Sequence, residues 1–171
     1  MRYSKRSVSV LLALGLTATA FPSSGDGFVR VAPNLAMATE RVTLELKRLA
    51  WKNLDGAWSP SQAEVQAAFD HLRTTQGNAE VLSTALPTMN MAVSLRRIPS
   101  SLFQVFGVIN KGRKCLLFEA LPKNDPIDPN DPNLWLKEII SVRVLDGGSA
   151  FWWVMYDVSS HRFVDCNRRP D

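Results

Sequence analysis

Three aspartates at every third position form the most regular pattern of metal-binding groups in the chain. Asp125, Asp128 and Asp131 each precede a proline, and a polyproline II path would place their carboxylates along one edge. Hard cations such as Ca²⁺ prefer oxygen ligands of this kind. The run lacks the glycine turn and terminal glutamate of a calcium-binding helix-loop-helix motif, which favours a stiff, solvated connection. The aspartates are therefore weak metal candidates, and we expect no metal or other cofactor.

Acid-base and nucleophilic groups are few. His71 follows Asp70 directly, and neighbours on a helix point about 100° apart, which makes mutual orientation awkward. Ser159-Ser160-His161 is interpreted as turn chemistry, because no Gly-x-Ser-x-Gly elbow accompanies it. Phosphate-loop, dinucleotide and zinc-binding spacings are also missing. An enzyme using Asp70, His71 or Asp157 as a base remains an alternative, and it requires a pocket.

Aromatic residues offer the strongest candidate for a binding surface. They are concentrated in residues 151–156, where strand alternation sends Trp152 and Tyr156 to one face and Trp153 to the other. One face must be core. The second is either an apolar binding patch or is also buried in a central strand, and burial on both faces is the favoured interpretation.

Basic residues near the predicted strand ends could bind an anionic partner if they converge. Arg96 and Arg113 are the main candidates. The alternative is that they only solubilise the edges of a sheet.

The chain contains two cysteines, Cys115 and Cys166. An even pair in an oxidising compartment usually forms a disulfide. The expected Cys115–Cys166 bond would close a loop of about 50 residues and stabilise the fold by roughly 3–4 kcal/mol. A reactive thiol, the alternative, would need a nearby base.

The first twenty residues predict export. Arg2, Lys5 and Arg6 precede an apolar run, and Ala18-Thr19-Ala20 fits a cleavage site. The run is too short to span a bilayer, so we expect a signal peptide over 1–20, a periplasmic or secreted location, and no transmembrane segment after cleavage. Residues 21–38 are expected to be a flexible leader, in which Ala36-Met37-Ala38 could mark a second processing step.

Export changes the charge balance. Residues 1–20 contain three of the 20 basic residues and none of the 16 acidic ones, which leaves a net charge of about +1. Nonspecific attraction to nucleic acid needs an excess of positive charge, so nucleic-acid binding is not expected.

The remaining residues, 39–171, predict one α+β domain. Amphipathic periodicity predicts a helix over 39–54, a second from Ser59-Pro60 to Gly77, and a short third over 78–86. Alternation then predicts an antiparallel meander of six strands, at 89–98, 102–110, 113–121, 135–145, 150–158 and 162–167.

Helices that precede such a sheet would bury their apolar stripes on one face of it, giving two layers with the sheet curved over the first helix. This order of elements resembles the general layout of cystatin-like and nuclear-transport-factor-2-like folds.

These observations favour a non-enzymatic exported protein. It would bind a partner protein or a small apolar ligand through the aromatic face of the sheet. A pocket between helix and sheet, used for ligand binding or catalysis, is the alternative. A stabilising subunit of an envelope assembly is a third class, which would present a large apolar interface.

Overall fold

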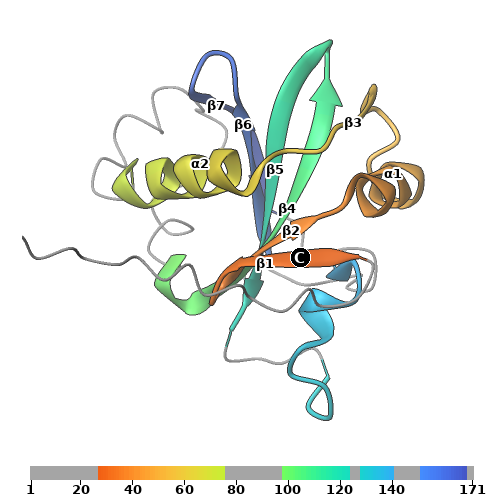
Figure 1. Ribbon diagram of the computed structural model, residues 1–171, viewed down its shortest axis with the longest axis vertical. Helices are drawn as coiled ribbons and strands as arrows, with labels where there is room; N and C mark the ends of the chain where they lie inside the picture. The colour runs from red at the N-terminus through yellow and green to blue at the C-terminus, as the bar shows by residue number, and fades with distance from the viewer. Residues whose placement is uncertain (1–26, 76–97, 124–127, 141–150, 169–171) are drawn as a thin grey trace, which may run out of the picture.

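A computed structural model describes residues 27–75, 98–123, 128–140 and 151–168, and within them the chain is an α+β domain (Figure 1). Two α-helices, α1 (Glu40–Leu49) and α2 (Gln62–Thr75), accompany two short 3-10 helices, η2 (Ile98–Ser100) and η3 (Leu134–Leu136). The strands are β1 (Phe28–Ala32), β2 (Leu35–Ala38), β3 (Gly56–Ala57), β4 (Ser101–Asn110), β5 (Arg113–Pro122), β6 (Trp152–Asp157) and β7 (Arg162–Arg168).

All seven described strands form one sheet, in which six follow the order β1-β2-β4-β5-β6-β7 and β3 pairs with β4 beside this path. The outer edge of β4 is shared by two short strands. β2 runs parallel to its first half, with Leu35 opposite Phe103, and β3 runs antiparallel to its second half, with Gly56 opposite Ile109. Helix α1 connects these two strands, so it is held against the sheet at both ends.

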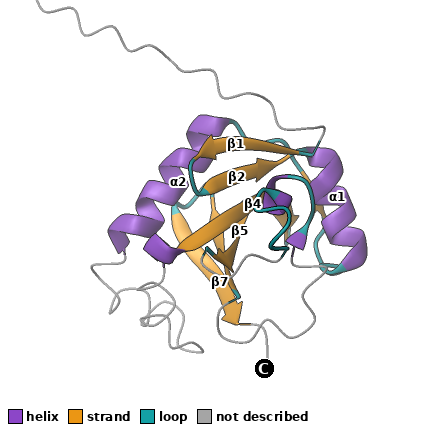
Figure 2. Cartoon of the chain, turned by 90° about the horizontal axis from the view of Figure 1, so that it is seen from below, coloured by secondary structure: helices purple, strands orange, loops and turns teal. Residues whose placement is uncertain are grey.

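The sheet is covered on both faces, as Figures 1 and 2 show. One face packs against α2 through Val65, Ala68, Phe69 and Leu72. The other packs against α1 through Val42 and Leu46, and against residues 134–140. The arrangement has three layers, so the expected two-layer packing on one sheet face is wrong.

Strand β5 shows why two covers are needed. Leu116 and Phe118 belong to the core on the α2 side, whereas Cys115 and Leu117 belong to the core on the α1 side. All four are at most 1% exposed. A strand that is apolar on both faces is stable only where both faces are shielded from water.

Helix α2 begins at a capping box. The Ser61 hydroxyl accepts a hydrogen bond from the backbone N–H of Glu64 at 3.2 Å, and a Glu64 carboxylate oxygen accepts one from the Ser61 N–H at 2.7 Å. The predicted helix is confirmed, but its cap is Ser61 rather than Ser59. Helix α1 is also confirmed, and it ends at Leu49, earlier than predicted.

The strands predicted over 102–110, 113–121, 150–158 and 162–167 correspond to β4, β5, β6 and β7. The two predicted hairpins, β4–β5 and β6–β7, are also confirmed. The β4–β5 turn places Lys111 and Gly112 at φ 50° and 73°, as a two-residue type I′ turn requires. The β6–β7 turn follows Asp157, where expected. The predicted helix over 78–86 and nearly all of the predicted strand over 89–98 lie outside the described residues.

The predicted strand over 135–145 is wrong in its described part. Residues 134–136 form η3, and three consecutive side chains, Leu134, Trp135 and Leu136, are buried. Because β5 pairs with β4 on one side and β6 on the other, no ladder position is left for a strand between them.

The flexible leader also needs correction, because β1 and β2 lie within it. Leu35 and Ala36 are 0% exposed and join the two sheet cores. Ala36-Met37-Ala38 is therefore part of a strand, and the folded domain already includes Phe28.

The expected Cys115–Cys166 disulfide is not formed, since Cys115 is a free, buried thiol. Cys115 lies opposite Asp157 on β6, whereas Cys166 lies opposite Val154 on the other side of β6. Two strand spacings amount to about 9–10 Å, and a disulfide requires Cα atoms within roughly 4.4–6.8 Å. Burial, with a smaller contribution from the Asp157 carboxylate, raises the pKa of Cys115 to about 11, so its thiol stays protonated.

Gly107 on β4 permits a close crossing of the chain and provides a test of the fold. A Cβ there would overlap the Trp58 carbonyl oxygen and lie 2.6 Å from Pro60 Cδ. We expect Gly107→Ala to lower the free energy of unfolding by about 2–3 kcal/mol, the effect of overpacking, as measured by urea denaturation.

Gly112→Ala is the matched control. A Cβ at Gly112 meets nothing within 4 Å, so only the positive φ of 73° opposes it. That strain should cost about 1 kcal/mol. Equal losses in the two variants would contradict the close crossing at Gly107.

Candidate functional site

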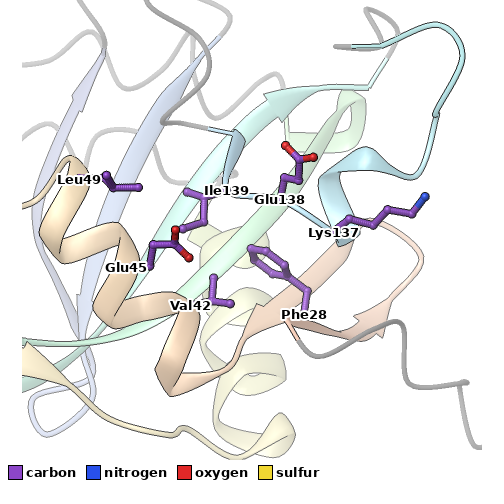
Figure 3. Close-up of a pocket in the computed structure, with 7 residues that line it drawn as sticks. All are labelled: Phe28, Val42, Glu45, Leu49, Lys137, Glu138 and Ile139. Atoms are coloured by element: carbon purple, nitrogen blue, oxygen red, sulfur yellow. The ribbon is translucent and has the colours of Figure 1, made fainter.

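A cavity of about 310 Å³ lies between α1 and residues 137–139 (Figure 3). Its walls are mainly apolar, and three charged residues stand among them. The lining residues are Phe28, Val42, Glu45, Leu49, Lys137, Glu138 and Ile139.

The apolar wall is built by side chains with fixed neighbours. Val42 lies on the buried stripe of α1, and Phe28 on β1 packs edge-on against Phe106 with ring centroids 5.9 Å apart. Leu49, at the end of α1, stays 40% exposed at the rim. The cavity therefore has a buried apolar floor and one apolar residue, Leu49, open to solvent.

The opposite wall is held by a buried amide, Gln104 on β4. Its Nε2 donates hydrogen bonds to the carbonyl oxygens of Trp135 at 2.7 Å and Glu138 at 2.6 Å, and its Oε1 accepts one from the Ile140 N–H at 3.1 Å. Gln104 is 0% exposed. It provides the partners that buried irregular backbone needs, and so fixes residues 135–140 against the sheet.

Charge at the cavity is asymmetric. Lys137 extends away from it (Figure 3), and its Nζ lies 2.7 Å from Asp131 Oδ2 in an ion pair. The Glu45 carboxylate points between Val42, Phe28 and Ile139. Glu45 is exposed, and within the described part of the chain its carboxylate has no hydrogen bond or ion pair. This carboxylate is the group best placed to meet a ligand.

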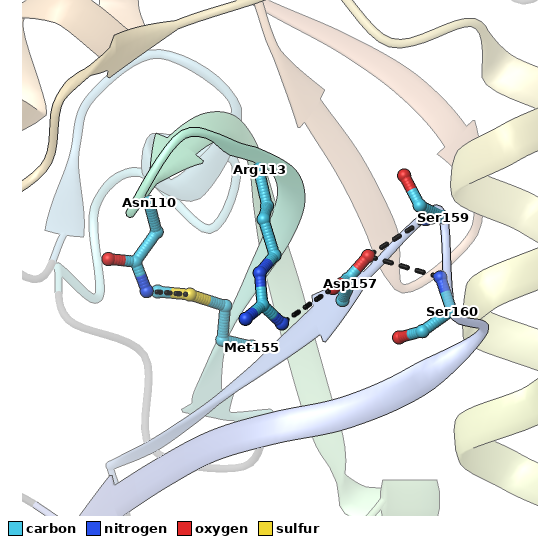
Figure 4. Close-up of polar contacts among 6 residues, drawn as sticks. All are labelled: Asn110, Arg113, Met155, Asp157, Ser159 and Ser160. Atoms are coloured by element: carbon cyan, nitrogen blue, oxygen red, sulfur yellow. Dashed lines mark hydrogen bonds and ion pairs between the residues drawn. The ribbon is translucent and has the colours of Figure 1, made fainter.

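A second polar cluster lies at the β6–β7 turn (Figure 4). Asp157 is 2% exposed, and its Oδ1 accepts hydrogen bonds from the N–H groups of Ser159 at 2.8 Å and Ser160 at 3.2 Å. Its Oδ2 lies 3.3 Å from Arg113 Nη1. Burial opposes ionisation, but these donors outweigh it and hold the pKa of Asp157 below its usual value. The carboxylate is fully used by the turn, which argues against a base at this position.

Both histidines of the chain lie beside Tyr156, a convergence that the sequence did not show. The Tyr156 hydroxyl is 3.1 Å from His161 Nδ1, and the His71 ring centroid is 5.7 Å from that of Tyr156. Burial, together with Asp157, raises the pKa of Tyr156, so the hydroxyl is neutral. His71 and Tyr156 both also pack against Phe163. This cluster ties the end of α2 to the last hairpin.

The predicted aromatic binding face is covered. Trp152 and Tyr156 are 2% and 5% exposed beneath α2. Trp153 is half-buried on the other face, 4.7 Å from the ring centroid of Trp51. Alternation is confirmed and both faces are buried, so these aromatics form packing layers.

The remaining candidates that the structure describes make local contacts and do not converge on one site. Arg113 pairs with Asp157, and Arg96 and Asp125 lie outside the described residues. Asp128 and Asp131 accept hydrogen bonds from the backbone N–H groups of Asn130 and Asn133. The described residues contain no cluster of three or more His, Cys, Asp or Glu suited to a metal. Asp70 is a surface residue bonded to Gln66, with Arg73 3.9 Å away.

No protein-family model, curated protein or solved structure matches this chain. Among the described helices, none has both the length and the apolar character needed to cross a membrane. The candidate site therefore depends on the geometry of the chain itself.

Gln104→Leu tests the amide that holds the cavity wall. The variant keeps a similar volume but leaves two carbonyl oxygens and one N–H buried without their present partner. We expect the free energy of unfolding to fall by about 2–4 kcal/mol. Thermal and urea denaturation measure this, and a wild-type stability would show that Gln104 does not anchor residues 135–140.

The Asp157 cluster predicts a pH dependence of stability. Because its pKa is lowered in the folded state, the carboxylate contributes stability that is complete above its unfolded pKa of about 3.9. That contribution is lost as the pH falls through the lower, folded value. Asp157→Asn should reduce stability at pH 7 by about 1–3 kcal/mol and flatten the loss of stability below pH 4. An unchanged acid profile in urea denaturation would contradict the assignment.

Proposed function

We propose that this is an exported, non-enzymatic domain that binds a small apolar molecule with a cationic group. The cavity between α1 and residues 137–139 is the site. The observation that carries the proposal is an apolar cavity of about 310 Å³ with the Glu45 carboxylate directed into it. The signal peptide that the sequence predicts over residues 1–20 is the ground for proposing a periplasmic or secreted location.

The size of the cavity defines the ligand class. Small-molecule sites usually occupy about 300–1,000 Å³, so this one fits a ligand at the small end. Each buried CH₂ contributes about 0.8 kcal/mol, and a chain of six carbons gains about 5 kcal/mol before the cost of association. Affinity for such a ligand should therefore be weak, with a Kd near millimolar.

Charge defines the head group. Lys137 is neutralised by Asp131, and Glu45 is exposed beside the apolar wall. An ammonium or guanidinium group next to Glu45 would gain an ion pair while the rest of the ligand contacts Val42 and Leu49. An exposed pair of this kind contributes at most about 1 kcal/mol, which gives selectivity rather than strength.

Binding without catalysis explains the site better than an acid-base enzyme. A catalytic base must be oriented toward its substrate, usually by a third group. Glu45 has no such partner within the described residues, and Asp157 is occupied by its turn and Arg113. The cavity therefore offers recognition but no assembled proton-transfer pair.

A matched ligand series tests the proposal. Hexylammonium, hexanol and hexanoate share one alkyl chain and differ in charge. In titrations followed by two-dimensional NMR, we expect affinity to decrease in that order, with shifts at residues around α1 and 137–139. Glu45→Gln should weaken hexylammonium binding about three- to fivefold and leave hexanol binding unchanged.

Asp70→Asn is the control, because it removes a carboxylate from α2 on the other side of the sheet. It should bind all three compounds like the wild type. Equal affinity for the cation and the anion, or an equal effect of the two substitutions, would refute the role of Glu45. Shifts located elsewhere would refute the cavity as the site.

A further inference from the structure

Lys137 is the one cation among the residues that line the cavity, and its direction affects the charge that a ligand meets. Its stem forms part of the wall near Phe28, whereas its ammonium group points away from the cavity (Figure 3). The side chain is 60% exposed, so packing does not fix the ammonium group. Lysine has a long flexible stem, which also allows this group to turn toward the cavity. The ammonium group therefore stays outside only while a partner holds it there.

Asp131 is that partner. Its Oδ2 atom lies 2.7 Å from the Lys137 Nζ atom. Its Oδ1 atom accepts a hydrogen bond from the Asn133 N–H at 3.2 Å, and its carbonyl oxygen accepts one from the Leu134 N–H at 3.0 Å. The hydrogen bond from Lys137, with a smaller contribution from Asn133, lowers the pKa of Asp131, so the carboxylate is charged at neutral pH. Because Leu134 is buried, the turn that carries this carboxylate is attached to the core.

We propose that Asp131 determines the charge preference of the cavity by holding Lys137 away from Glu45. The inference rests on the proposed function, because it names the residue that makes the same site prefer a cation. Asp131 does not line the cavity, so it acts through Lys137 and not by contact with the ligand. Glu45 is exposed and has no hydrogen bond or ion pair within the described part of the chain, which leaves it open to a cationic group.

Release of Lys137 would act on charged ligands in opposite directions. An anion in the cavity would gain the ammonium group as a partner, whereas a cation would compete with that group for Glu45. Each effect amounts to about three- to fivefold in affinity, the range of an exposed ion pair. An uncharged ligand of the same length would show neither effect. A purely structural role of Asp131 predicts a different result, because damage to the wall would weaken all ligands alike.

Asp131→Asn tests the inference, since asparagine keeps an oxygen for the Asn133 N–H but offers no charge to Lys137. Hexylammonium, hexanol and hexanoate are titrated into the purified protein and followed by two-dimensional NMR. Relative to the wild type, we expect hexanoate to bind about three- to fivefold more tightly, hexylammonium to bind more weakly by a similar factor, and hexanol to be unchanged. Equal weakening of all three compounds would indicate a structural role and overturn the inference.

Asp128→Asn is the matched control. It removes a carboxylate from the same loop, and that carboxylate accepts a hydrogen bond from the Asn130 N–H at 2.9 Å instead of pairing with Lys137. The variant should bind all three compounds like the wild type. If it changes the affinities as Asp131→Asn does, the preference depends only on the net charge of the loop, and the inference is wrong.

Lys137→Met shows whether Asp131 acts through the lysine. Methionine retains an apolar stem and removes the ammonium group, so Asp131→Asn should have little effect on binding in this background. A change in charge preference as large as in the wild-type background would overturn the inference.

The same titrations separate the inference from the proposed function. If the wild type binds none of the three compounds, the proposed function fails and the inference fails with it. If the wild type prefers hexylammonium and Asp131→Asn keeps that preference to the same degree, only the inference fails.

Discussion

The central strands of the sheet are apolar on both faces, and this constraint shapes the whole domain. Strand β5 is buried from Cys115 to Leu121, and no single helix layer could shield both of its sides. One face is covered by α2, whose apolar stripe meets Phe103 and Phe118. The other face is wider than α1, so a second segment, residues 134–140, completes it. The apolar stripes of both helices are therefore buried against the sheet. The aromatic side chains of β6 are covered, and the candidate binding site lies instead between α1 and residues 137–139.

That second cover combines a regular helix with irregular backbone, and the candidate site lies where they meet. Irregular backbone is stable in a core only when its polar groups find partners. Gln104 supplies three hydrogen bonds from the middle of the sheet, which brings residues 135–140 close without a strand ladder. The side chains of α1 and of residues 134–140 do not interlock as the regular side-chain ridges of two packed helices do. A cavity remains at their junction, and the hydrogen bonds from Gln104 hold one of its walls against the sheet.

The sequence predicted what depends on neighbouring residues. Alternation over residues 151–156 assigned the two faces of β6 correctly, and Asn110-Lys111-Gly112 located the first hairpin turn. The sequence-based prediction was wrong where a segment's structure depends on residues far away in the chain. Leu35–Ala38 is too short to show periodicity, and it becomes a strand because β1 and β4 pair with it on its two sides. The cysteine pair gave no information on register, and the role of Gln104 depends on residues 31 to 36 positions away.

The distribution of carboxylates explains why recognition is expected at the rim of the cavity rather than in the core. A buried carboxylate is tolerated only when donors surround it, as Ser159, Ser160 and Arg113 surround Asp157. Glu119, 5% exposed, is also buried and accepts a hydrogen bond from Trp51 at 3.1 Å. The Asp157 carboxylate, with three donors around it, has little capacity left for a ligand. Glu45, in contrast, is exposed to water, and it stands beside an apolar wall that water solvates poorly. A ligand that covers this wall also lowers the local dielectric constant around Glu45, so apolar contact and charge recognition reinforce each other.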